Sequence, residues 1–116
     1  MKYRSSSVSL CVRDYLKKST LNALVFDLRF NDNEDEISFI IREIGRRKDK
    51  DVAKTITPYL KHSNENILIA AIDALGDMEV GSEYLLELLE NKSHSAAIVS
   101  SAEFSLLKMG CTPKSL

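Results

Sequence analysis

The chain has 116 residues, 44% of them hydrophobic and 28% charged, which is the balance of one soluble globular domain. Its 16 basic and 17 acidic side chains leave a formal net charge of -1, so the basic excess typical of nucleic-acid-binding proteins is absent. No apolar run approaches the roughly 18 residues that span a bilayer, and four Gly and two Pro residues disfavour a turn-rich all-β fold.

Apolar residues spaced three and four apart recur from one end of the chain to the other, which predicts one helix after another. Alternation of polar and apolar residues with a period of two never persists, so no strand is expected. The predicted helices cover residues 6–17, 20–30, 34–46, 51–61, 65–76, 82–90 and 95–109.

Capping residues mark several of these helix ends. Asn33 and Glu36 have the spacing of a cap followed three residues later by a carboxylate, and Asn64 precedes the fifth helix. We expect Gly45 to end the third helix. We expect Gly76 to end the fifth helix by adopting a positive φ.

The stretch AAIDALGD, residues 70–77, is one copy of an internal repeat. Leu75 follows Ile44 by 31 residues, and Leu106 follows Leu75 by the same interval. Because one helical hairpin cannot bury its apolar face alone, this period predicts a stack of hairpins that share a core. Further corresponding positions are Ile37/Leu68/Val99, Ile40/Ala71/Ala102 and, at a spacing of 29, Ile56/Leu85, Tyr59/Leu88 and Leu60/Leu89.

The repeated residues resemble HEAT-like repeats, specifically the short variety found in phycobilisome lyases. The family pattern is roughly A-x-x-A-L-G, a short turn, and an amphipathic helix that ends in L-x-x-L-L. Pro58 lies where many HEAT repeats carry a proline that bends the first helix. Leu68 and Val99 stand where the family usually has an Arg paired with an Asp, so the usual Asp/Arg ladder is not expected. The matching positions are Ala71, Ala74, Leu75, Gly76, Leu85, Leu88 and Leu89, and less fully Ala102, Leu106, Met109 and Gly110.

The resemblance covers residues 34–110 and implies an all-α fold, a short right-handed α-solenoid of about three HEAT-like hairpins. Residues 1–116 are expected to form a single domain. Within it, repeats with a period of about 31 residues occupy 34–110. A degenerate N-terminal capping helix or hairpin occupies 1–33.

The two cysteines, Cys11 and Cys111, lie near opposite ends of the chain. A secreted domain held by disulfides carries more cysteines, so we predict two free thiols in a reducing compartment. The apolar run before Arg13 is too short for a signal peptide. The sequence therefore predicts a soluble, cytoplasmic protein.

The face opposite the apolar stripe of the second helix in each pair is the best candidate for a site. On a helical wheel it forms two rows across the repeats. The first row is Arg42–Asp73–Phe104 and the second is Arg46–Asp77–Lys108. One interpretation is a pair of cross-repeat salt bridges. The other is a concave wall that contacts a protein partner, with Phe39 and Phe104 as aromatic anchors.

Other polar clusters give weaker evidence for a functional site. The basic run Arg46–Lys50 includes Asp49 and is interpreted as a solvated loop, and the acidic run Asp32–Glu36 as helix capping. His62 and His94 fall in corresponding loops, but neither has a metal-ligand partner at helical spacing. No catalytic motif appears, so we expect no metal, no cofactor and no enzymatic activity.

These observations predict a non-catalytic module that binds a protein partner, for example a small bacterial adaptor or a toxin-neutralising immunity protein. Two alternatives stay open: a lyase-type enzyme or enzyme subunit, and a nucleic-acid-binding HEAT-like protein, which the mixed charge of the wall disfavours. Self-association is a further prediction, because the end of a solenoid leaves apolar area uncapped. The predicted binding residues are Phe39, Arg42, Arg46, Asp73, Asp77, Phe104 and Lys108.

Overall fold

The computed structural model describes residues 10–90 and 94–110, with side chains from residue 14 onward. Residues 6–9 of the first predicted helix, the Cys11 side chain and Cys111 lie outside this description. No strand occurs in the described part of the chain. Its helices are α1 (Leu10–Lys18), α2 (Leu21–Phe30), α3 (Glu34–Arg47), α4 (Ala53–Ile56), α5 (Glu65–Met78), α6 (Ser82–Glu90) and α7 (Ala96–Lys108), with the 3-10 helices η1 (Lys50–Val52) and η2 (Thr57–Lys61) on either side of α4.

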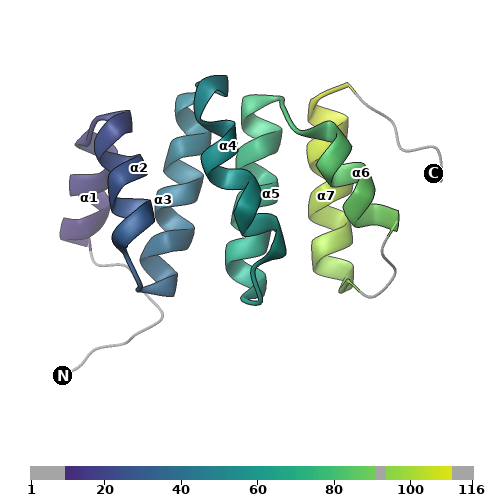
Figure 1. The fold of residues 1–116 in the computed structure, drawn as a ribbon, viewed down its shortest axis with the longest axis horizontal. Helices are drawn as coiled ribbons and strands as arrows, with labels where there is room; N and C mark the ends of the chain where they lie inside the picture. Colours follow the sequence, from purple (N-terminus) through teal and green to yellow (C-terminus); the bar gives the residue numbers. More distant parts are fainter. Residues whose placement is uncertain (1–9, 91–93, 111–116) are drawn as a thin grey trace.

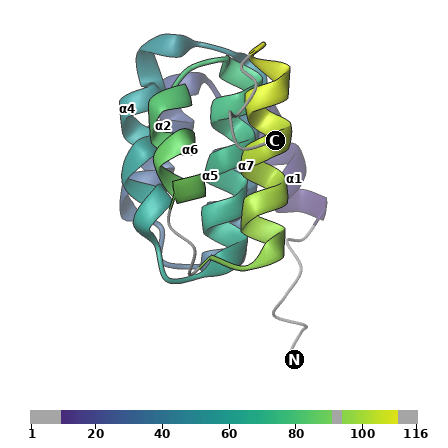
Figure 2. The ribbon, with the colours of Figure 1, turned by 90° about the vertical axis from the view of Figure 1, so that its right-hand side faces the viewer.

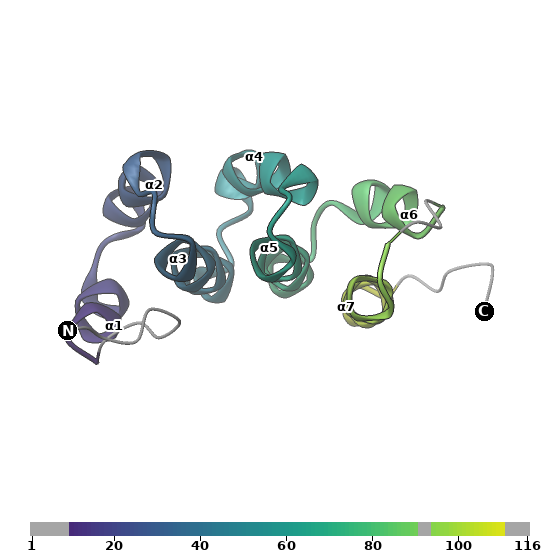
Figure 3. The same cartoon turned by 90° about the horizontal axis from the view of Figure 1, so that it is seen from below.

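The helices form two layers. Viewed along the stack, α2, α4 and α6 lie on one side, which we call the outer layer (Figure 2). Helices α5 and α7 lie on the other side, which we call the inner row. The chain runs down each helix of the outer layer and up each helix of the inner row while it advances along the stack (Figure 1). This path is a right-handed turn, so the predicted all-α, right-handed solenoid of HEAT-like hairpins is confirmed. The row α1, α3, α5, α7 lies on the inside of a shallow arc (Figure 3).

The N-termini of the inner helices are capped at a regular interval. Asn33 accepts a hydrogen bond from the Glu36 amide at 3.1 Å, as predicted. Asn64 accepts one from the Ile67 amide at 3.3 Å, and Ser95 accepts one from the Ile98 amide at 3.4 Å. Each cap satisfies an amide that has no partner within its own helix.

The prediction that two glycines end the inner helices is wrong. α3 continues past Gly45 and α5 continues past Gly76. The left-handed residues at their ends are Lys48 (φ 57°) and Glu79 (φ 59°). The glycines are explained by close approach, because a Cβ on Gly76 would lie 2.6 Å from the Ser105 hydroxyl oxygen.

The helix predicted over 51–61, with a bend at Pro58, is divided into three short pieces. The chain forms η1, then the single turn of α4, then η2. Pro58 lies in the first turn of η2, where its missing N–H leaves no hydrogen bond unmade. Inside a continuous α-helix the same residue would remove a bond and clash with the preceding turn, so the segment divides there.

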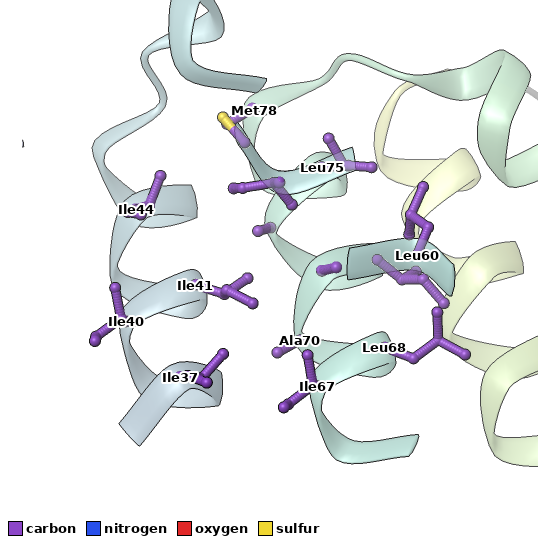
Figure 4. Packing of buried hydrophobic residues seen from close by; sticks show 14 of the residues in the cluster. Ile37, Ile40, Ile41, Ile44, Leu60, Ile67, Leu68, Ala70, Leu75 and Met78 are labelled. Atoms are coloured by element: carbon purple, nitrogen blue, oxygen red, sulfur yellow. The ribbon is translucent and has the colours of Figure 1, made fainter. Parts of the chain in front are cut away.

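The core lies between the two layers and along the inner row. α5 has helices on both sides, so apolar residues around most of its circumference are buried, including Ile67, Ile72 and Leu75. Ile37 and Ile41 point from α3 toward α5 (Figure 4). The buried polar group on α7, the Ser105 hydroxyl, donates a hydrogen bond to the Ile72 carbonyl at 3.1 Å, which removes the penalty for burying it unpaired.

Candidate functional site

The predicted site residues lie on the three inner helices. Phe39, Arg42 and Arg46 come from α3, Asp73 and Asp77 from α5, and Phe104 and Lys108 from α7. We call this set the inner wall. Helices α3, α5 and α7 occupy the inside of the arc (Figure 3).

The first predicted row contains a cross-repeat ion pair. The guanidinium of Arg42 donates to the Asp73 carboxylate at 2.8 Å across an interval of 31 residues. Both side chains keep contact with solvent, so the pair is worth about 0–1 kcal/mol. Phe104 continues the row on α7 and is 59% exposed.

The second row forms only in part. Lys108 donates to Asp77 at 2.9 Å, which confirms that pair. Arg46 instead donates to Glu43 at 3.2 Å on its own helix, so the predicted contact between Arg46 and Asp77 is wrong. Glu43 is 6% exposed, and a buried carboxylate needs a nearby cation more than a solvated one does.

The two phenylalanines of the inner wall differ in exposure. Phe39 is half-buried and packs against the core. Phe104 is exposed, and the Lys108 ammonium lies 5.1 Å from the centre of its ring, within range of a cation–π interaction. Phe104 is therefore the aromatic side chain of the wall that offers most of its ring to a partner.

A second set of cross-repeat contacts, which we call the carboxylate ladder, joins the repeats at the N-termini of the inner helices. The Asn64 amide donates to the Glu34 carboxylate at 2.7 Å, and the Ser95 hydroxyl donates to the Glu65 carboxylate. This ladder was not predicted from the sequence. Its signal is a pair of carboxylates 31 residues apart, each directly after a helix cap.

His62 lies in the loop after η2, and His94 lies in the loop before α7. His62 accepts a hydrogen bond from the Asn64 amide at 2.9 Å through Nδ1, and its ring stacks on Tyr59 with centroids 6.2 Å apart. Among the residues that the structure describes, no group of three or more His, Cys, Asp and Glu side chains could hold a metal ion. Tyr59 donates to the Leu28 carbonyl at 3.4 Å, and burial raises the pKa of its phenol.

A groove that was not predicted from the sequence lies in the outer layer, between η2 and α6. Its volume is about 660 Å³, within the range of sites that hold small ligands or several side chains. Because the lining residues come from separate repeats, their sequence spacing gave no signal. The groove is lined by Thr57, Pro58, Leu60, Lys61, Tyr84, Glu87, Leu88 and His94.

Comparison with known proteins agrees with this architecture. A family model described as HEAT repeats matches residues 22–106, which include α3, α5 and most of α7. No curated protein and no solved structure gives a match. None of the described helices is both long enough and apolar enough to cross a membrane. The match spans most of the chain, and the hairpins stack as the family requires, so this protein belongs to the HEAT repeat family.

Proposed function

We propose that the chain is a non-catalytic protein-binding module whose inner wall contacts a protein partner. HEAT repeats generally mediate protein–protein interactions. The observation that carries the proposal is Phe104, a 59% exposed aromatic ring at the edge of a charged surface. Aromatic anchors surrounded by polar groups dominate the affinity of many protein interfaces.

The ion pairs of the wall support this role because they join its three helices. Arg42 joins α3 to α5 through Asp73, and Lys108 joins α7 to α5 through Asp77. A surface ordered before binding loses less conformational entropy when the partner arrives. The paired charges also favour a partner with matching polar groups over a purely apolar one.

The experiment is a pull-down from native lysate with wild-type protein and Phe104→Ala. The matched control is Phe26→Ala, which removes a ring of similar exposure (62%) from α2, away from the inner wall. We expect a protein that co-purifies with the wild type and with Phe26→Ala, but not with Phe104→Ala. Circular dichroism establishes that each variant is folded.

Three results would contradict the proposal. If the partner still co-purifies with Phe104→Ala, the binding surface lies elsewhere. If both variants lose the partner equally, the inner wall has no specific role in binding. Nucleic acid or pigment recovered in place of protein would favour the nucleic-acid-binding or lyase-type alternative. For the biological setting, we propose a small adaptor or a toxin-neutralising immunity protein, and the recovered partner distinguishes these two.

A further inference from the structure

The outer-layer groove follows from the way the two layers pack. In the inner row, Gly76 lets α5 approach α7 until a Cβ at that position would overlap Ser105. In the outer layer, η2 and α6 lie farther apart than α5 and α7 do. The close inner contact and the wider outer spacing together open the groove between Pro58 on η2 and Tyr84 on α6.

The groove has an apolar lining and charged side chains of opposite sign. Leu60 is buried and Leu88 is half-buried, so their aliphatic side chains supply apolar surface inside the groove. Lys61 comes from the η2 side and Glu87 from the α6 side, and both are exposed. Tyr84 is 44% exposed and adds an aromatic face.

The charges of the groove differ from those of the inner wall. Arg42, Asp73 and Lys108 already form ion pairs within the chain. Within residues 14–90 and 94–110, Lys61 and Glu87 have no ion-pair partner. They are therefore free to pair with charges on a bound molecule.

We propose that this groove docks an amphipathic helix from a protein partner. The apolar stripe of that helix lies against Leu60, Leu88 and Tyr84. A carboxylate on one flank pairs with Lys61, and a cation on the other flank pairs with Glu87. A purely anionic surface or ligand would pair with Lys61 but face the unpaired carboxylate of Glu87, so the mixed charge favours a segment that carries both signs. The groove lies in the opposite layer from the inner wall and is a second binding surface, independent of the first.

The test uses three pools of labelled 18-residue helical peptides, with fluorescence anisotropy as the readout. Each pool has randomised apolar residues at one stripe. Its flanking positions carry Glu on one side and Lys on the other (mixed), Glu on both (acidic) or Lys on both (basic). We expect the wild type to bind the mixed pool most tightly. Each mismatched flank in the other two pools should weaken binding about two- to five-fold.

Charge reversal in the protein should change the preferred pool. Lys61→Glu leaves two carboxylates at the groove and should prefer the basic pool, whereas Glu87→Lys should prefer the acidic pool. Lys61→Glu combined with Glu87→Lys should restore preference for the mixed pool, because the helix can bind in the reverse direction. Both side chains are exposed, so these variants should fold, as circular dichroism will check.

Two further variants separate the groove from the inner wall. Tyr84→Ala should weaken all three pools about ten-fold or more, and Phe104→Ala should leave them unchanged. Absence of binding by every pool at about 1 mM peptide, or one ranking shared by all charge variants, would overturn the proposal. Weakening by Phe104→Ala with no effect of Tyr84→Ala would also overturn it, and would instead place the peptide on the inner wall.

Discussion

Gly45 and Gly76 show that a helix-stop motif can have another cause. Both follow an aliphatic residue near the end of an inner helix, where a C-terminal cap is the usual interpretation. In the structure they lie inside the helices, against the next inner helix, with Ala74 and Ser105 as the nearest neighbours. Gly is retained there because a side chain would hold the two backbones apart.

The sign of the stability change on Gly76→Ala tests this explanation. At a mid-helix glycine with free space, alanine stabilises by about 0.5–1 kcal/mol. Here the added Cβ would lie 2.6 Å from Ser105 Oγ, so we expect a loss of about 1–3 kcal/mol from overpacking. Urea denaturation gives the free energy of unfolding. Gly76→Ala together with Ser105→Gly should cost less than the sum of the two single changes, and stabilisation by Gly76→Ala alone would rule out the close approach.

At the scale of elements, one arginine of α3 binds the end of α1. Arg47 of α3 donates to the Leu16 carbonyl at 3.3 Å and to the Lys17 carbonyl at 3.1 Å, both in the last turn of α1. Its Nε also lies 3.5 Å from the buried Glu43 carboxylate. A cation at a helix C-terminus satisfies carbonyls that have no partner within the helix and interacts favourably with the helix dipole.

Arg47→Ala should therefore loosen α1 selectively. We expect faster amide hydrogen exchange in α1 and a loss of about 1–3 kcal/mol in the free energy of unfolding, since two α1 carbonyls and the buried Glu43 carboxylate lose a charged partner. Arg46→Ala is the matched control, because Arg46 pairs with the same Glu43 but donates no hydrogen bond to α1. Equal exchange rates in α1 of the two variants would show that Arg47 does not attach this helix.

At the scale of the whole molecule, the last inner helix differs from the two before it. The residues at corresponding positions are Glu34/Glu65/Ala96, Ile41/Ile72/Glu103 and Gly45/Gly76/Leu107. In α3 and α5 these residues include a ladder carboxylate, a fully buried isoleucine and a close-approach glycine. In α7 the same side carries Ala96, Glu103 and an exposed Leu107, which suits contact with solvent better than contact with another helix of this kind.

Glu103→Ile combined with Leu107→Gly should give α7 the contact residues of α5. We expect this variant to associate at concentrations where the wild type elutes as a smaller species, because its last inner helix then presents an unsatisfied apolar face. Size-exclusion chromatography with light scattering measures the change. Glu103→Gln combined with Leu107→Gln alters the same positions without adding apolar surface and should not associate. If the first variant elutes like the wild type, these positions do not limit stacking. Association of the wild type itself stays a prediction.

The sequence by itself determined the helical class, most element positions and the repeat. Helix periodicity and N-terminal caps such as Asn33 and Asn64 depend on residues a few positions apart, so they can be identified without tertiary contacts. The interval of 31 residues also placed Arg42 opposite Asp73, and Asp77 opposite Lys108, as the structure confirms. Equal positions in adjacent repeats become neighbours whenever the repeats stack in register.

The tertiary structure alone decided features that depend on the distance between helices. Arg46 pairs with Glu43 because that carboxylate is buried one turn away. Phe39 is half-buried, whereas Phe104 is exposed. The groove between Lys61 and Glu87 also needs the outer helices to separate while the inner ones pack closely. Periodicity specifies which side of a helix a residue occupies, but how near the next helix comes is set by the packing of side chains between them.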